Sequence, residues 1–236
     1  MPIAIIFDLD NTLYDAEQYF RQAFYDISEY LSKKYPENTK KRIYDVLFSL
    51  WKNKTSMYPK LFDEALEILG IEEPVDNLIW VFDNCKIKLT PYQDAIYILK
   101  KLKKDDYRLG LLTDGKIHRQ NRKIDSLGIR RFFDAIVICE ETGFRKPSPV
   151  PYKHILDKLK AFPHLSLYVG DNPLIDFEGA KKAGMYTVRI LRGEFRTYKS
   201  NALVDWEIDK FKELIEVIRE IEVRANEGTC DSTTSR

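Results

Sequence analysis

Residues 4–15 read AIIFDLDNTLYD, an apolar run that ends abruptly at two carboxylates separated by one residue. A short apolar run of this kind predicts a strand that is buried on both faces, as in parallel sheets. In open α/β sheets the functional groups gather just beyond the carboxyl ends of the strands. We therefore expect Asp8 to end this strand and to face that crevice, with Asp10 following on the same side of the chain.

Asp8 and Asp10 admit two interpretations. Two carboxylates this close resist joint ionisation unless a cation or hydrogen-bond donors offset their repulsion. The pair suits a carboxylate nucleophile beside a general acid or base, with Mg²⁺ nearby. The alternative is a strand-to-helix turn in which both side chains only cap backbone amides, because Asp, Asn and Thr are good turn residues.

The composition bounds the class of protein. The chain has 236 residues, 44% of them hydrophobic, which is enough for one large domain or a core with a smaller insert. Its net charge of +1 gives no reason to expect nucleic acid or an anionic membrane as a partner. No apolar run approaches the roughly 20 residues of a membrane span. The absence of a signal-peptide pattern and three widely separated cysteines predict a cytoplasmic protein with buried thiols. We expect it to be a monomer or a small homo-oligomer.

Helical periodicity dominates the segment after the first strand. Four apolar faces with helical spacing follow one another without a strand between them, at 16–35, 41–51, 61–69 and 74–86. They interrupt an alternation of strands and helices that resumes afterwards. The sequence therefore predicts an inserted four-helix domain at 15–86.

The alternation resumes with a helix that we expect to be capped by Thr90 and Pro91. Apolar runs at 108–112, 135–139, 165–169 and 187–191 then predict strands with helices between them, and a helix closes the domain near 211–218. With the first strand, these make a doubly wound, parallel, five-stranded Rossmann-like sheet of the α/β class. The core domain would comprise 1–14 and 87–225, and the polar segment 226–236 would be a disordered tail.

Three further segments of the core carry polar residues suited to phosphoryl chemistry. The Thr113 hydroxyl and the amide of Asp114 follow a strand, where they could bind a phosphoryl oxygen or simply cap the next helix. Lys146 lies in a proline-stiffened loop, either as a fixed cation or as an ordinary solvated charge. Asp171 follows a buried strand and Asp176 lies five positions on, which suits either a cation site or helix capping.

Together these motifs resemble those of the haloacid dehalogenase-like (HAD) hydrolases, in the helical-cap subgroup. Asp8-Leu9-Asp10-Asn11-Thr12-Leu13 is similar to the first family motif, and Thr113 matches the second. Lys146-Pro147-Ser148-Pro149 resembles the third, and Gly170-Asp171 with Asp176 resembles the fourth. All four occur in the family's order and at the ends of predicted strands, and the helical insert corresponds to the family's cap domain.

The resemblance implies a role for each of these residues. Asp8, Asp10 and Lys146 would be catalytic, and Thr113, Asp114 and Lys146 would bind the substrate. Mg²⁺ would be held by Asp8, the backbone carbonyl of Asp10, and Asp171, with Asp176 acting through water or as an orienting group. Asp114 departs from the pattern, because Asn is common at that position in this subgroup.

The function implied is a Mg²⁺-dependent phosphatase that hydrolyses a small phosphorylated metabolite through an aspartyl-phosphate intermediate. A phosphomutase acting on a sugar phosphate is the alternative, and a 2-haloacid dehalogenase is disfavoured because that reaction needs no acid at position 10. As a further hypothesis, Lys54 and Tyr58 in the loop 52–58 of the insert would read the non-reacting end of the substrate.

Overall fold

The computed structural model of the protein describes residues 3–230, which divide into two compact units. One unit contains the described residues up to Asp15 together with those from Thr90 onward, and the other contains Ala16–Leu89. The sequence predicts the insert at 15–86, and its role as a cap stays a prediction. None of the helices described is long and apolar enough to cross a membrane.

The first unit is built on a parallel sheet with β1 (Ala4–Phe7) among its inner strands. The strand order is β3-β2-β1-β4-β5-β6, and every neighbouring pair is parallel. The other strands are β2 (Arg108–Thr113), β3 (Ala135–Ile138), β4 (Ser166–Gly170), β5 (Tyr186–Ile190) and β6 (Trp206–Ile208). This order confirms the predicted α/β class with a doubly wound sheet.

The predicted number of strands is wrong by one, because the described residues contain six strands rather than five. The additional strand, β6, pairs with β5 through only three residues. Trp206 and Ile208 flank a glutamate, so they form no apolar run that the sequence pattern could register. Its place at the edge of the sheet leaves the inner strands as predicted.

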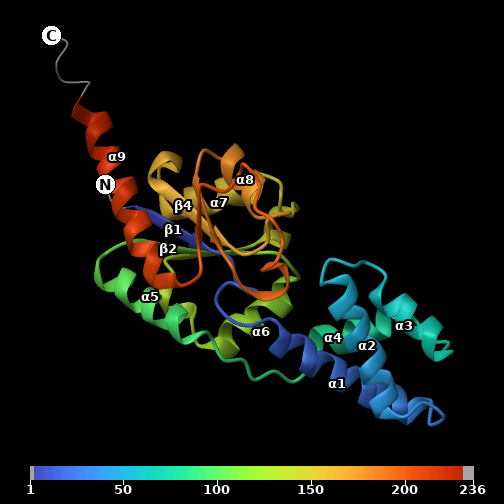
Figure 1. Ribbon diagram of the computed structural model, residues 1–236. Helices are drawn as coiled ribbons and strands as arrows, with labels where there is room; N and C mark the ends of the chain where they lie inside the picture. Colours follow the sequence, from blue (N-terminus) through green and yellow to red (C-terminus); the bar gives the residue numbers. More distant parts are fainter. Residues whose placement is uncertain (1–2, 231–236) are drawn as a thin grey trace. The chain divides into compact units, whose positions relative to one another are not determined.

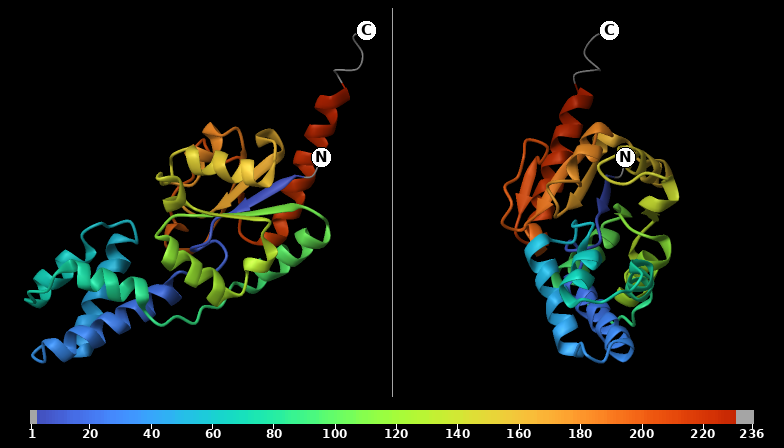
Figure 2. Two further views of the ribbon diagram at one scale, coloured as in Figure 1. Left: turned by 180° about the vertical axis from the view of Figure 1, so that it is seen from behind. Right: turned by 90° about the vertical axis from the view of Figure 1, so that its right-hand side faces the viewer.

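Helices cover both faces of the sheet (Figures 1 and 2). The layer formed by α7 and α8 lies on one face, where α7 packs on β2 and β3 and α8 packs on β4 and β5; α5 and α6 lie on the other face. The helices are α5 (Gln93–Lys104), α6 (Ile117–Leu127), α7 (Val150–Leu159), α8 (Phe177–Lys182) and α9 (Leu214–Cys230). Short 3-10 turns occur at Arg130–Phe132, Cys139–Thr142, Pro163–Leu165, Gly193–Phe195 and Phe211–Glu213.

Two predicted boundaries differ in the structure. The expected cap at Thr90 is wrong, because α5 begins at Gln93 and Pro91 instead forms a bridge with Tyr14, next to the loop after β1. At the other end, α9 continues to Cys230, so it extends into the predicted disordered tail. The rest of that tail, 231–236, lies outside the described residues.

The alternation of side chains along β1 connects the two layers of the core. Ala4 and Ile6 are completely buried in an apolar cluster with Tyr152 and Ile155 of α7. Phe7 points to the opposite face and packs edge-on against Phe211, with ring centroids 5.8 Å apart. Burial on both faces is what the unbroken apolar run predicts for an inner parallel strand.

The second unit is a helical bundle with an aromatic core. It comprises α1 (Glu17–Lys34), α2 (Lys40–Lys54), α3 (Leu61–Leu69) and α4 (Val75–Asn84). Phe20 of α1 stacks on Trp51 of α2 at 4.6 Å between centroids, and Phe82 of α4 packs against both Tyr19 and Phe20. Gly70 ends α3 in the left-handed conformation, as its position after the apolar face predicts.

The glycine of α8 lies where no side chain fits. A Cβ atom at Gly179 would lie 2.4 Å from Cε2 of Tyr152 and 2.7 Å from the carbonyl oxygens of Pro147 and Ser148. This close approach packs α8 directly on the loop that carries Lys146. The helix therefore needs glycine here despite its low helix propensity.

We expect Gly179→Ala to destabilise the protein. Alanine would gain about 1 kcal/mol of helix propensity, but overpacking against backbone carbonyls costs about 1–3 kcal/mol or more because backbone cannot move aside as a flexible side chain can. Urea unfolding of the variant and the wild-type protein measures the difference. An unchanged or increased free energy of unfolding would show that the loop at 147–148 yields to the new methyl group.

Candidate active site

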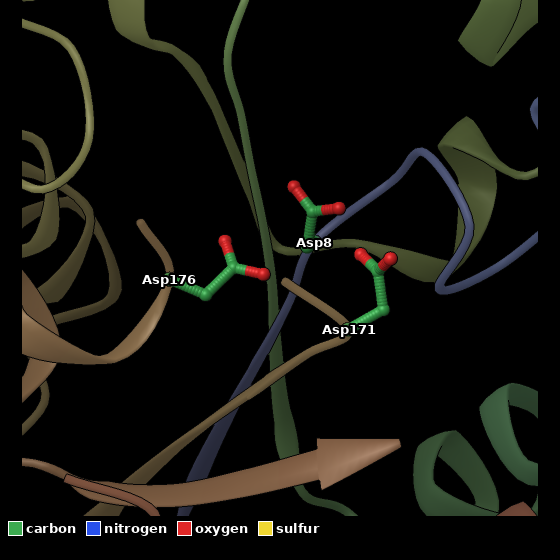
Figure 3. Close-up of side chains that lie close together, drawn as sticks. All are labelled: Asp8, Asp171 and Asp176. Carbon is green, nitrogen blue, oxygen red and sulfur yellow. The ribbon is translucent and has the colours of Figure 1, made fainter. Parts of the chain in front are cut away.

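Three buried carboxylates meet at the carboxyl edge of the sheet. Asp8 directly follows β1 and Asp171 directly follows β4, and these two strands are neighbours. Asp176 occupies the N-cap position of α8. One carboxylate oxygen from each residue lies within 4.8 Å of the others. Figure 3 shows the carboxylates of Asp8 and Asp171 side by side, with that of Asp176 directed toward Asp8.

The Lys146 ammonium lies between two of these carboxylates. Its Nζ atom is 2.5 Å from Oδ1 of Asp8 and 2.9 Å from Oδ1 of Asp176, and the lysine side chain is only 2% exposed. Asp176 is further fixed by the amide of Asn172, which donates to Oδ2, and by the Tyr168 hydroxyl, which donates to Oδ1. Both oxygens of Asp176 are thus engaged within the protein, which suits an orienting role better than a direct cation ligand.

Asp171 is the least satisfied member of the cluster. Its Oδ2 atom is buried and has no hydrogen-bond partner among the residues described. Three carboxylates around one ammonium leave an excess of negative charge in a buried space. An oxygen-rich, partly unsatisfied site of this kind fits a hard divalent cation such as Mg²⁺.

The pKa values in the cluster reflect this excess of negative charge. Burial raises the pKa of Asp8 to about 7, although the Lys146 charge opposes the shift. Burial also raises the pKa of Asp171 well above its usual value, and the charges of Asp176 and Asp8 add to the effect. For Lys146, burial alone would lower the pKa, but the charges of Asp176 and Asp8 hold it well above its usual value.

Asp10 is in a different environment, because its carboxylate lies outside the cluster of Asp8, Asp171 and Asp176. It accepts hydrogen bonds from Nζ of Lys123 at 2.7 and 3.0 Å, from Nε2 of Gln120 at 3.0 Å, and from the Tyr14 hydroxyl. Burial would raise its pKa, but the Lys123 charge and these hydrogen bonds hold the pKa of Asp10 below its usual value. The Asp10 carboxylate is thus engaged within the protein, and a metal contact through the Asp10 backbone carbonyl stays a prediction.

Thr113 and Asp114 lie at the end of β2 and on the residue after it. The Thr113 hydroxyl is buried and accepts a hydrogen bond from Gln120 at 2.7 Å. The Asp114 carboxylate accepts a hydrogen bond from the backbone amide of Lys146 at 3.3 Å, so it helps to hold the lysine loop. All the residues that the sequence singles out in the core lie at this one edge of the sheet, while their individual roles stay predictions.

The sequence analysis missed Gln120 and Lys123, which both contact Asp10. They occupy the buried face of α6 together with Ile124 and Leu127, at helical spacing. Two polar residues at core positions of an amphipathic helix are the signal that could have identified them.

In the helical unit, the proposed specificity residues have partners of their own. The Tyr58 hydroxyl donates to Oε2 of Glu64 at 2.6 Å, and Nζ of Lys54 lies 3.5 Å from the same oxygen. Both contacts lie within one unit, and a role for these residues in reading a substrate stays a prediction.

Comparison with known proteins places these residues in a family. Residues 5–190 match the family of haloacid dehalogenase-like hydrolases. The chain belongs to this family. Among its relatives, the glyceraldehyde 3-phosphate phosphatase of Methanopyrus kandleri is 33% identical over 227 residues, covering 92% of this chain and 97% of the relative. The enzyme of the same name from Methanocaldococcus jannaschii is 31% identical over 221 residues, with the same coverage of both chains.

Solved structures agree on the HAD fold. A HAD phosphatase from Thermococcus onnurineus aligns with a TM-score of 0.67 and 24% identity, covering 92% of this chain and 97% of that one. A HAD-hydrolase from Bacillus subtilis bound to magnesium aligns with a TM-score of 0.69 and 21% identity, covering 92% and 98%. The comparisons confirm the predicted family and the prediction of an enzyme, a phosphatase-type hydrolase.

We expect Lys146→Met to destabilise the metal-free protein more at pH 8 than at pH 5. Without the ammonium, Asp8 and Asp176 would be buried, unpaired carboxylates, and breaking such a pair costs about 3–5 kcal/mol when the charge persists. The pKa of Asp8 is already about 7 with Lys146 in place, and removal of the cation raises it further. At pH 5 the Asp8 carboxyl of the variant is protonated at little cost in free energy, so the loss of stability is smaller at that pH.

Urea unfolding of the wild-type and variant proteins in chelator at both pH values measures this difference. Lys101→Met is the matched control, since it removes a helical lysine that pairs with Asp105 at the surface, and it should show no comparable pH dependence. An equal loss at both pH values for Lys146→Met would contradict the buried ion pair.

Proposed function

We propose that this protein is a Mg²⁺-dependent phosphatase that releases inorganic phosphate from a small phosphorylated metabolite. The observation that carries the proposal is the buried Asp8 carboxylate, paired with Lys146 and placed beside Asp171 at the end of neighbouring strands. Glyceraldehyde 3-phosphate is the first substrate to test, because the relatives from Methanopyrus kandleri and Methanocaldococcus jannaschii carry that name. A cytoplasmic location and a monomeric or small homo-oligomeric state remain predictions.

Asp8 and Asp171 would hold the cation through their carboxylates, and Asp10 would contribute its backbone carbonyl. The buried Oδ2 of Asp171, which has no hydrogen-bond partner among the residues described, supports this choice. Asp176 would orient Lys146 and the loop after β4, because its two oxygens already accept hydrogen bonds from the protein. Bound Mg²⁺ would offset the charge of the phosphoryl oxygens next to Asp8.

The chemical steps follow from the contacts of Asp8 and Asp10. A carboxylate oxygen of Asp8 attacks phosphorus, and the ester bond breaks as the new oxygen–phosphorus bond forms. Asp10 gives a proton to the departing oxygen; it later takes a proton from the water that attacks the aspartyl-phosphate and frees Asp8. The approach of a phosphate dianion raises the pKa of Asp10 and so favours the protonated form that the first step needs.

The transition state spreads negative charge over the equatorial phosphoryl oxygens. Lys146, the Thr113 hydroxyl and the backbone amide of Asp114 supply donors for these oxygens. Lys146 is held between Asp8 and Asp176, and Thr113 is held by Gln120, so both donors are fixed before the substrate arrives. Fixed donors need no reorganisation at the moment of reaction, which is the source of their effect.

We expect Asp8→Asn to abolish phosphate release from every substrate, because the variant lacks the nucleophile while its size is unchanged. Asp10→Asn should lower turnover by about 10²–10⁴-fold, the usual contribution of a positioned acid or base. Released phosphate is measured on glyceraldehyde 3-phosphate and a panel of phosphorylated metabolites, with the exposed Asp105→Asn as control. Conversion of a substrate into an isomeric phosphate ester, without release of inorganic phosphate, would indicate a phosphomutase instead.

We also expect Mg²⁺ to stabilise the protein more at pH 8 than at pH 5. Asp8 and Asp171 have raised pKa values in the folded protein, so the metal-free folded state binds more protons than the unfolded state above about pH 4. The stability that these groups contribute therefore falls as the pH rises toward 7. A cation that binds their ionised forms restores that stability, and it must displace protons to do so at pH 5.

The measurement is the melting temperature in chelator and after addition of Mg²⁺ at each pH. In Asp171→Asn, the gain from Mg²⁺ should be much smaller at pH 8. Equal gains at both pH values in the wild-type protein would rule out the buried carboxylates as the ligands.

A further inference from the structure

Helix α6 presents two polar side chains to the interior beside Asp10. Gln120 and Lys123 are separated by three positions, so they share one face of the helix. The Lys123 side chain is only 6% exposed, and a buried ammonium is costly unless it is paired. Its Nζ atom contacts both carboxylate oxygens of Asp10, at 2.7 and 3.0 Å.

Gln120 links Asp10 to Thr113. Its Nε2 atom donates to Oδ2 of Asp10 at 3.0 Å and to the Thr113 hydroxyl at 2.7 Å. The amide is oriented by this arrangement, because the reverse orientation would place its oxygen against a carboxylate. The Oε1 atom of Gln120 accordingly remains buried without a hydrogen-bond partner among the residues described.

The contact with Gln120 also determines what the Thr113 hydroxyl can do. Since its oxygen accepts the Gln120 hydrogen bond, its own hydrogen must point elsewhere. Among the residues described, its hydrogen-bond acceptor is the carbonyl oxygen of Asp114 at 3.5 Å, which is too distant for a strong hydrogen bond. The hydroxyl is thus set up as a donor to an incoming phosphoryl oxygen.

Asp10 depends on such contacts for its orientation, because it lies beyond the end of β1 rather than within the strand. The Tyr14 hydroxyl donates to Oδ1, while Gln120 donates to Oδ2 and Lys123 contacts both oxygens. Donors from two separate segments therefore restrict the carboxylate to one side-chain conformation. Without them, Asp10 would distribute over several rotamers.

We propose that Gln120 and Lys123 are positioning residues for the reaction, which hold the Asp10 carboxylate and the Thr113 hydroxyl in fixed relation to each other. One face of α6 then sets both the group that protonates the departing oxygen and a donor to the phosphoryl group. This inference rests on the proposed phosphatase function. A purely structural role, in which Lys123 only neutralises a buried charge, is the competing explanation.

The two explanations differ in how the rate depends on the departing group. An alkoxide must be protonated as it leaves, whereas a dinitrophenolate leaves without help. Loss of Asp10 positioning therefore slows the cleavage of an alkyl phosphate much more than that of an activated aryl phosphate. A general loss of folded protein slows both to the same extent.

The test compares kcat/KM for glyceraldehyde 3-phosphate and 2,4-dinitrophenyl phosphate in Lys123→Met and Gln120→Met. We expect a fall of about 10–100-fold on the alkyl ester for Lys123→Met, part of the full effect of a positioned acid. On the aryl ester we expect a much smaller change. In an Asp10→Asn background, Lys123→Met should leave the ratio of the two rates unchanged, because the group that it positions is already gone.

Lys101→Met on α5 serves as the matched control and should leave both rates unchanged, since its lysine pairs with Asp105 at the helix end remote from the site. Equal falls on both esters in Lys123→Met, or an unchanged ratio in both single variants, would overturn the proposal. If either variant fails to fold in a melting experiment, the other decides between the two explanations.

A crystal structure of Lys123→Met gives a readout that does not depend on turnover. We expect the Asp10 carboxylate to leave its position or to occupy several conformations. If it stays in contact with Gln120 and Tyr14 in a single conformation, the positioning role is wrong. Should the wild-type protein hydrolyse neither ester, the proposed function fails, and the crystal structure still decides whether Lys123 orients Asp10.

Discussion

The burial of the Lys146 ammonium between Asp8 and Asp176 is the constraint on which the site depends. Three carboxylates cannot remain ionised together in the interior without a cation close by. The surrounding structure packs closely around this pair: the Tyr152 hydroxyl donates to the Asp176 carbonyl at 2.6 Å, and Gly179 lets α8 approach the loop that carries the lysine. The ion pair therefore depends on the packing of α7 and α8, which hold Asp176 and the Lys146 loop in place.

Asp8 and Asp10 show how two acids in one short segment acquire opposite properties. Burial and the neighbouring carboxylates raise the pKa of Asp8, whereas Lys123 and two further donors hold the pKa of Asp10 low. The two side chains differ because β1 delivers Asp8 to the edge shared with β4, while the turn after it brings Asp10 to α6. Bound Mg²⁺ beside Asp8 and a phosphate dianion beside Asp10 would each shift these pKa values in the opposite direction, toward an ionised Asp8 and a protonated Asp10.

The sequence predicted the edge of the sheet at which these residues meet because that edge follows from topology. In a parallel sheet every strand ends on the same side, so polar residues after Phe7, Leu112 and Val169 must lie near one another once the strands are recognised. It did not predict β6, whose three residues form no pattern, or the bridge of Pro91 to Tyr14, since local cap preferences gave way to a tertiary contact. Periodicity can place Gln120 and Lys123 on the buried face of α6, but it could not show that this face meets Asp10, which lies more than a hundred positions away in the chain.

The direction of α6 explains how it supplies those partners of Asp10. Helix α6 begins shortly after β2 ends, so its first turns lie at the carboxyl edge of the sheet, and Gln120 and Lys123 fall within about the first two turns. Farther along the same face, Ile124 and Leu127 are apolar and pack in the core. Helix α5 leads into β2 and therefore ends at the opposite edge, where Lys101 and Lys103 pair with carboxylates at the surface. The change from polar to apolar along one buried helix face thus marks how far the site reaches into the fold.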